Sequence, residues 1–166
     1  MQSSFDCYIG IGSNLHQPMQ QITAALDLLQ TLPHTSLIKT SHLYQNPAML
    51  AEENATPQPD YINAVAWIQT TLEPELLLKH LQTLETQQGR QRTGKIWSSR
   101  TLDLDVLLYG DLKIDSPSLT IPHKGLLERA FVLIPLCDCN PDLILPNGKV
   151  VKDFISDDMK QQLTRI

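Results

Sequence analysis

The stretch Arg100-Thr-Leu-Asp103-Leu-Asp105-Val-Leu-Leu places two carboxylates two residues apart inside an otherwise apolar run. Because successive side chains of a strand point to opposite faces, Asp103 and Asp105 are predicted to share one face. The other face is predicted to be apolar and to carry Leu102, Leu104, Val106 and Leu108. Paired negative charges on a half-buried strand are costly unless a cation or a basic partner lies between them.

Mg²⁺ fits such a pair, because it binds one or two carboxylates at about 2.0–2.1 Å and completes its shell with water and substrate phosphate. The stretch therefore predicts a strand that carries a metal site. An edge strand with solvated charges is the alternative for the Asp-x-Asp pattern by itself.

A basic segment lies just upstream of the carboxylates. Arg90, Arg92, Lys95 and Arg100 are four of the thirteen Lys and Arg residues of a chain whose net charge is −5, and Trp97 lies among them. A local cluster of cations in an acidic protein indicates a compact polyphosphate ligand more than a long nucleic-acid track. We therefore expect a nucleotide triphosphate site.

Length and composition indicate a single domain. The chain has 166 residues, of which 42% are hydrophobic, so residues 1–166 can form one compact core. No apolar run reaches the roughly 20 residues that span a bilayer, and the first residues lack the features of a secretory signal, so we expect a cytoplasmic protein without membrane contact. Cys7, Cys137 and Cys139 are expected to be reduced thiols in the core, because zinc needs four ligands and disulfides need pairs.

Hydrophobic periodicity predicts alternating strands and helices. Strands are expected at Phe5–Ile11, Ser36–Tyr44 and Tyr61–Thr70 and over the Asp-bearing stretch, and helices from Pro18 toward Pro33 and from Pro74 to Gly89. Gly10 to Asn14 is interpreted as a tight turn, and Gln45 to Asp60 as a long loop of the kind that is often functional. This order predicts an α+β, ferredoxin-like α/β sandwich, in which helices cover one face of an antiparallel sheet.

The last third is predicted to be a C-terminal extension of this sandwich. A short hairpin is expected at Lys113 and Ile114, after a turn at Tyr109-Gly110-Asp111. The stretch from Leu126 to Leu136 is predicted to be partly helical and broken by Pro135.

Several ordered blocks resemble the 6-hydroxymethyl-7,8-dihydropterin pyrophosphokinase family over nearly the whole chain. They are Ile11-Gly-Ser-Asn-Leu15, Gln58-Pro-Asp-Tyr61-Ile-Asn63-Ala, Glu85-Thr-Gln-Gln-Gly-Arg90, Arg100-Thr-Leu-Asp103-Leu-Asp105, Ile121-Pro-His123 and Arg129-Ala-Phe131. The chain has no Gly-x4-Gly-Lys-Ser/Thr loop. The resemblance implies transfer of pyrophosphate from ATP to the pterin hydroxymethyl group, with release of AMP, in folate biosynthesis.

The resemblance also implies the site residues. Asp103 and Asp105 match the carboxylates that hold two Mg²⁺ ions with ATP, and together with Arg90 and Arg100 they form the expected catalytic set. The expected ATP-binding residues are Gln82, Glu85, Arg92, Trp97, Arg100, Val106, Thr120, His123 and Arg129. The expected pterin-binding residues are Asn46, Pro47, Met49, Tyr61, Asn63, Trp97 and Phe131.

Physical reasoning supports several of these roles. Tyr61 and Asn63 lie two apart on a predicted strand, so an aromatic ring and an amide face the same side. For Trp97, the resemblance implies the role of the family's lid tryptophan, which is expected to exclude water when the arginine segment closes. Without the resemblance, Tyr61 is a core tyrosine, His123 and Arg129 are surface residues, and Gln82 and Glu85 belong to an exposed helix face.

The chain departs from the family pattern near the lid and near His123. Ile96 stands where many relatives have a basic residue, and Ser98-Ser99 where they have Gly-Pro. Lys124 follows His123, where some relatives have an aromatic residue. These changes alter the expected lid and nucleotide contacts but leave the two aspartates intact.

Two other functional classes are weighed against this one. A ferredoxin-like nucleic-acid-binding module needs exposed aromatic platforms and broad positive charge, whereas aromatic residues are 5% of this acidic chain. An Asp-x-Asp glycosyl- or nucleotidyltransferase generally needs a larger fold. We therefore expect ATP and 6-hydroxymethyl-7,8-dihydropterin as partners, no nucleic acid, and a monomer.

Overall fold

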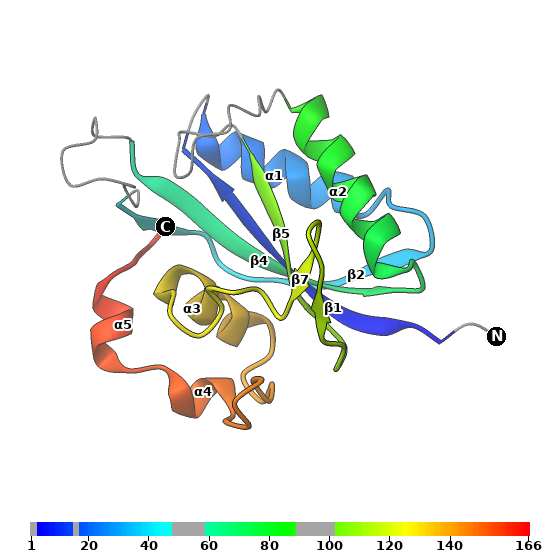
Figure 1. Ribbon diagram of the computed structural model, residues 1–166. Helices are drawn as coiled ribbons and strands as arrows, with labels where there is room; N and C mark the ends of the chain where they lie inside the picture. The colour runs from blue at the N-terminus through cyan, green and yellow to red at the C-terminus, as the bar shows by residue number, and fades with distance from the viewer. Residues whose placement is uncertain (1–2, 15–16, 48–58, 89–101) are drawn as a thin grey trace.

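The computed structural model describes residues 3–14, 17–47, 59–88 and 102–166, and Figure 1 shows how their elements are arranged. In chain order they are β1 (Phe5–Ser13), α1 (Pro18–Leu29), β2 (Thr35–Thr40), β3 (Tyr44–Asn46), β4 (Tyr61–Thr70), α2 (Pro74–Gln87), β5 (Asp103–Tyr109), β6 (Ile114–Asp115), β7 (Thr120–Ile121), α3 (Ala130–Cys139), α4 (Val151–Phe154), α5 (Asp157–Gln161) and β8 (Thr164–Arg165).

One six-stranded sheet organises the molecule. Its order is β5-β1-β4-β3-β8, with β2 also paired to β4, and all of its strand pairs are antiparallel. The first two thirds of the chain thus have the strand and helix order of the predicted ferredoxin-like α+β sandwich. The C-terminal extension adds β8 to the edge of the sheet beside β3.

The first face of the sheet is covered by α1 and α2, which lie on the same side in Figure 1. Both helices begin at the predicted proline, whose fixed backbone angle and missing N–H suit the first turn. Their apolar stripes bury Ile22, Leu29 and Leu81 against Ile9 and other strand residues. The predicted end at Gly89 lies outside the described residues.

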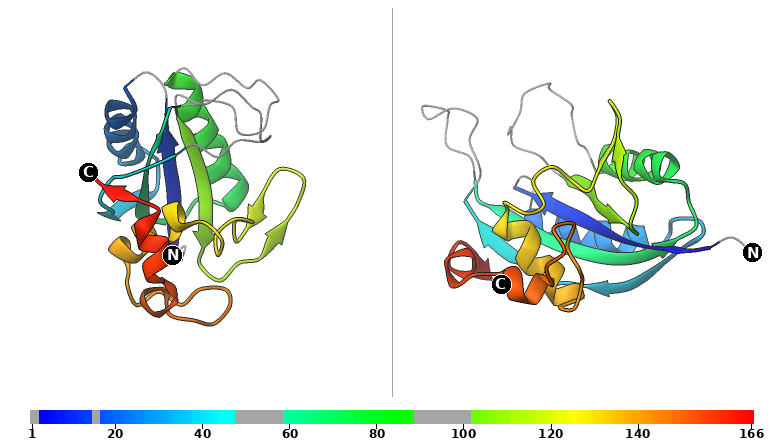
Figure 2. Two further views of the ribbon diagram at one scale, coloured as in Figure 1. Left: turned by 90° about the vertical axis from the view of Figure 1, so that its left-hand side faces the viewer. Right: turned by 60° about the horizontal axis from the view of Figure 1, so that its bottom comes forward.

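The second face is partly covered by the C-terminal extension, whose helices add to those of the predicted sandwich. A second core cluster joins α3, α4 and α5 to this face, and it includes Leu133, Leu136 and Val151 packed with Tyr8 and Val65. The two views in Figure 2 show the sheet between the two groups of helices. The apolar residues of the C-terminal extension form this core.

The predicted turn at Gly10 to Asn14 was wrong, because β1 continues to Ser13. Gly10 pairs with Val65 on β4 and Asp105 on β5, and Gly12 with Asn63 and Asp103. The glycines are regular strand residues whose missing side chains leave room on one face of the sheet.

The predicted strand Ser36–Tyr44 is divided into β2 and β3 at Ser41. The Ser41 N–H donates to the Val65 carbonyl at 2.9 Å, and the Ser41 hydroxyl accepts from the Val65 N–H at 2.8 Å. A side chain thus replaces a backbone partner, so the ladder is interrupted until Tyr44 pairs with Asn63.

Two further predictions fail through packing. Pro135 lies inside α3 and does not break it, because burial of the helix outweighs the hydrogen bond that proline cannot donate. Leu108 joins the second core cluster instead of the first, because a register shift in the β1–β5 pairing changes the side to which it points.

The prediction of a short hairpin is confirmed within the described residues. A short hairpin follows the turn at Gly110, although its strands are β6 and β7. Cys7, Cys137 and Cys139 are free thiols, and burial raises the pKa of Cys7 and of Cys139 to about 12. Among the described helices, none has the length and apolar character that a membrane span requires.

The second core cluster gives a stability prediction. Leu133 is fully buried on α3, so Leu133→Ala should lower the free energy of unfolding by about 2–5 kcal/mol. Leu76, which is 45% exposed on α2, is the matched control, and its replacement by alanine should change stability by less than about 0.5 kcal/mol. Urea denaturation measures both, and equal effects would contradict the packing described for the second face.

Candidate active site

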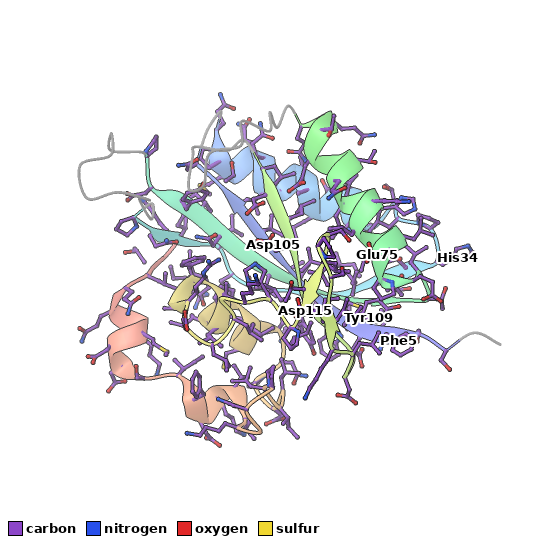
Figure 3. All side chains as sticks on the ribbon, in the orientation of Figure 1. Phe5, His34, Glu75, Asp105, Tyr109 and Asp115 are labelled. Carbon is purple, nitrogen blue, oxygen red and sulfur yellow. The ribbon has the colours of Figure 1, made fainter. Side chains whose placement is uncertain are left out.

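A hollow of about 700 Å³, measured out to its open side, lies on the second face of the sheet beside the start of α3. We call it the central hollow. Its described lining residues are Gly10, Ile11, Gly12, Asn46, Tyr61, Asn63, Ala64, Val65, Asp103, Asp105, Leu107, His123, Arg129, Phe131 and Val132. Figure 3 labels Asp105, which projects from β5, whereas Asp115 lies on the separate hairpin.

The floor of the central hollow follows from strand register. Asp103 pairs with Gly12, which pairs with Asn63, so a carboxylate and an amide are separated by one glycine strand. Adjacent strands lie about 4.8 Å apart, which puts the backbones of Asp103 and Asn63 roughly 10 Å from each other. The carboxylates therefore line one side of the floor and the amide lines the other.

Gly12 is required for this shape. A Cβ at position 12 would lie 2.9 Å from the Oδ1 atom of Asn63 and next to the ring of Tyr61. Any side chain here would displace the amide and occupy the space between the two sides of the hollow.

The direction of the two aspartates is set by the opposite side of β5. Leu102, Leu104 and Val106 are buried in the first core cluster, which turns Asp103 and Asp105 to the other face as predicted. The Leu104 N–H, between the two aspartates, donates to the Glu85 carboxylate at 2.8 Å. Glu85 is only 3% exposed on α2, so a buried carboxylate holds the start of the strand to this helix.

His123 lies next to the carboxylates. Its Nε2 atom is 4.0 Å from Asp105 Oδ2, and its Nδ1 atom accepts the Gly125 N–H at 3.1 Å. Because a backbone N–H can only donate, Nδ1 is unprotonated and the neutral ring carries its proton on Nε2. Gly125 also allows close approach of Arg129, since a Cβ there would lie 2.3 Å from Arg129 Nε.

The surroundings of His123 favour its neutral form. Burial lowers the pKa of His123, and the Arg129 guanidinium lowers it further, while the Asp103 carboxylate acts in the opposite direction. A neutral imidazole with Nε2–H is a hydrogen-bond donor facing the carboxylate side of the hollow.

The opposite side of the hollow combines aromatic rings with amides. Tyr61 comes from β4 and Phe131 from the first turn of α3, and the Arg129 guanidinium lies 5.8 Å from the centre of the Phe131 ring. Asn63 donates from its side chain to Asn46. A planar ligand with polar edges fits such a lining, because flat rings supply contact area and amides supply direction.

The donor set suits a hard cation held jointly with a ligand. Asp103 and Asp105 offer carboxylate oxygens on one face, and the Asp105 side chain is 40% exposed. Within the described ranges, no three His, Cys, Asp or Glu residues gather into a metal-binding group. Two carboxylates leave most positions of an octahedral ion to water and phosphate, which is the way Mg²⁺ is usually bound.

The structure brings together many of the residues that the sequence suggested. Asn46, Tyr61, Asn63, Asp103, Asp105, His123, Arg129 and Phe131 all line the central hollow. Pro47 lines an adjoining groove that shares Asn46, Arg129 and Phe131 with the hollow.

Other suggested residues lie elsewhere or outside the described ranges. Glu85 and Val106 are buried on the helix-covered side of β5, Gln82 lies in a shallow groove on α2, and Thr120 lies on β7. Lys124 is exposed next to His123. The expectations for Met49, Arg90, Arg92, Trp97, Arg100, Ile96 and Ser98-Ser99 concern residues outside the described part of the chain.

Sequence reasoning did not assign Gly10 and Gly12 to the site. The signal was present, because Cys7, Ile9 and Ile11 alternate with Tyr8, Gly10 and Gly12. That period of two predicts a strand that extends past the glycines, with a bare stripe on one face. Val65, Leu107 and Val132 gave no such signal, because the sequence does not distinguish an apolar residue that lines a hollow from one that is buried in the core.

The fold is that of a small α+β domain, and its central hollow combines carboxylates, amides and aromatic rings. The family model for 7,8-dihydro-6-hydroxymethylpterin-pyrophosphokinase matches residues 8–141, and the chain belongs to this family.

Individual relatives agree with the family model. The chain is 44% identical over 148 residues to the 2-amino-4-hydroxy-6-hydroxymethyldihydropteridine pyrophosphokinase of Haemophilus influenzae, covering 89% of each chain. It is also 44% identical over 149 residues to the protein of the same name from Pseudomonas aeruginosa, covering 90% of this chain and 89% of that one.

Solved structures support the fold. The wild-type HPPK-DHPS of Plasmodium falciparum with SDX-DHP superposes with a TM-score of 0.72 at 13% identity, over all of this chain and 48% of that one. The same protein with pterin and p-hydroxybenzoate gives a TM-score of 0.71 at 12% identity, over 99% of this chain and 45% of that one. This chain thus spans about half the length of those solved chains.

The electrostatics of the site give a titration prediction. In metal-free protein, the His123 imidazole should titrate below its ordinary range, and Arg129→Gln should raise its pKa because a neighbouring positive charge is removed. Asp103→Asn should lower this pKa, because the opposing carboxylate is lost. NMR titration of the ring protons measures all three proteins, and an unchanged midpoint in Arg129→Gln would contradict the proximity of the guanidinium.

Proposed function

We propose that this protein transfers pyrophosphate from ATP to the hydroxymethyl group of 6-hydroxymethyl-7,8-dihydropterin and releases AMP, a step of folate biosynthesis. In this reaction the hydroxymethyl oxygen of the pterin forms a bond to the β-phosphorus of ATP and loses its proton to solvent. The bond between the β-phosphorus and the oxygen that bridges it to the α-phosphorus breaks, and AMP leaves with that oxygen. The row Asp103–Gly12–Asn63 carries the proposal, because it sets a carboxylate side and an amide side across one glycine strand.

Two Mg²⁺ ions bound with ATP would neutralise phosphate charge and align the transferring group. We propose that Asp103 and Asp105 hold these ions, which is supported by their shared face and oxygen donors. His123 would donate from Nε2 to a phosphate oxygen, and Arg129 would add positive charge beside it. Arg90, Arg92 and Arg100 are proposed to clamp the triphosphate with forked hydrogen bonds.

The pterin is proposed to bind on the amide side. Tyr61 and Phe131 would contact the faces of the bicycle, Asn63 would bond its polar edge with its side chain, and Asn46 would contact the pterin through backbone groups. Pro47, Met49 and Trp97 are proposed to complete the enclosure, with Trp97 as a lid that excludes water. Gln82, Glu85, Val106 and Thr120 stay proposals for the nucleotide side. These four nucleotide-side residues do not line the central hollow, so their support comes from the family resemblance.

We further propose that residues 1–166 act as one catalytic domain, as a monomer in the cytoplasm. The described lining of the central hollow comes from β1, β3, β4, β5 and the segment from His123 to Val132.

The carboxylate pair gives the first functional prediction. Asp103→Asn or Asp105→Asn should lower AMP formation from ATP, Mg²⁺ and hydroxymethyldihydropterin by about 10³-fold or more, since metal-held phosphate charge is worth several kcal/mol. Asp115→Asn, on the hairpin, is the matched control and should retain activity. Chromatography of the nucleotides separates AMP from ADP, and full activity in either site variant with unchanged melting temperature would refute the role of the pair.

The shared hollow gives a second functional prediction. Pterin should bind at least about fivefold more tightly when a non-hydrolysable ATP analogue and Mg²⁺ are present. Each ligand orders side chains of the central hollow that the other ligand also contacts, and each shields the other from water. Calorimetric titrations with and without the analogue measure the two affinities. Equal affinities would count against assembly of both substrates in one hollow.

A further inference from the structure

Two buried amides meet at the pterin side of the central hollow. Asn46, at the end of β3, is 7% exposed, and Asn63, in β4, is 8% exposed. The Asn63 Nδ2 group donates to the Asn46 Oδ1 atom. Because an amide can present either its oxygen or its nitrogen, the chemistry of this wall depends on what fixes the two orientations.

A backbone carbonyl fixes them. The Asn46 Nδ2 group donates to the Pro47 carbonyl at 3.1 Å. A carbonyl can only accept, so Asn46 must turn its nitrogen toward Pro47 and its oxygen toward Asn63. The nitrogen of Asn63 must then face the Asn46 oxygen. The Pro47 carbonyl thus determines the orientation of both side-chain amides.

The strand that ends at Asn46 is held within the sheet. β3 pairs with β4 through Tyr44, Gln45 and Asn46. On its other edge it pairs with β8, through Tyr44 with Arg165 and Gln45 with Thr164. Asn46 is therefore the last residue of a strand that has partners along both edges up to Gln45.

The oxygen of Asn63 is directed at the floor of the hollow. A Cβ at position 12 would lie only 2.9 Å from this atom, and Gly12 leaves that space open. A ligand lying over the glycine thus meets an acceptor whose direction is already set.

We propose that Asn46 is a positioning residue that locks Asn63 as a hydrogen-bond acceptor, and that the relay Pro47–Asn46–Asn63 selects a ring edge bearing N–H donors. This inference rests on the proposed function for the identity of the ligand and adds the rule by which the site chooses its edge. A ring with an acceptor at that edge would face the Asn63 oxygen and lose the contact, while reversal of the amides would set two oxygens against each other at Pro47.

The test uses dihydropterin analogues in which one donor at a time, the 2-amino group or a ring N–H, is replaced by carbon. Calorimetry is done with the ATP analogue and Mg²⁺ present. In the wild-type protein, deletion of the donor that meets Asn63 should weaken binding by about tenfold or more, because a polar site rejects a ligand that leaves it unpaired. In Asn46→Ala the same deletion should cost less than about threefold, since the freed Asn63 amide can rotate.

Two variants control for general damage. Asn46→Thr keeps a hydroxyl that can donate to the Pro47 carbonyl and accept from Asn63, so it should restore the wild-type discrimination. Gln45→Ala removes an exposed neighbour that bonds Asp60 and should leave discrimination unchanged. Equal losses in wild type and Asn46→Ala, or no loss for any donor in wild type, would overturn the inference while leaving the proposed reaction in place.

A measurement on the wild-type protein makes the test independent of how the variants fold. Side-chain hydrogen exchange of Asn63, followed by NMR, should be slower than that of the exposed Gln45 amide, because Asn46 holds the Asn63 N–H in a buried bond. Equal exchange rates would overturn the relay. If the wild-type protein binds no pterin at all, the proposed function fails first and the selection rule fails with it.

Discussion

The candidate site depends on the alternation of β5. Leu102, Leu104 and Val106 are held in the core beneath α2, so the backbone must direct Asp103 and Asp105 to the opposite face. Two carboxylates on one face repel each other, and a cation between them relieves that repulsion. The apolar core on one side of the strand thus holds two negative charges together on the other side, and this arrangement is suited to a cation.

The second constraint is the bare strand between the two sides of the hollow. β1 contributes Gly10 and Gly12 where its neighbours contribute carboxylates and an amide, so the middle of the floor has no side chain. Under the proposed function, this gap is where the phosphate chain and the pterin alcohol meet. The strand spacing then sets how far apart the two binding regions lie, and rigid strands carry both.

Much of the frame could be predicted from the sequence because its signals are local. Proline at Pro18 and Pro74 marks helix starts, and leucines at helical spacing mark buried stripes. The strand Tyr61–Thr70 has the predicted bounds, and the shared face of the two aspartates follows from a period of two. The family resemblance then supplied most of the residues that line the central hollow.

The errors lie where tertiary contacts override local preference. Glycine favours turns in isolation, but Gly10 and Gly12 are fixed in a strand by partners on both sides. Ser41 interrupts a strand through a hydrogen bond to Val65, and Pro135 is tolerated in α3 because the helix is buried. The relay from Pro47 to Asn63 depends on side-chain orientations in space, which no spacing in the sequence encodes.

Direct observation of the metal tests the central claim most sharply. A crystal grown with Mn²⁺ and a non-hydrolysable ATP analogue, measured at the manganese absorption edge, should show anomalous peaks in contact with both Asp103 and Asp105 and with the analogue's phosphates. Peaks held by phosphate alone, with the two carboxylates directed away into solvent, would contradict the account.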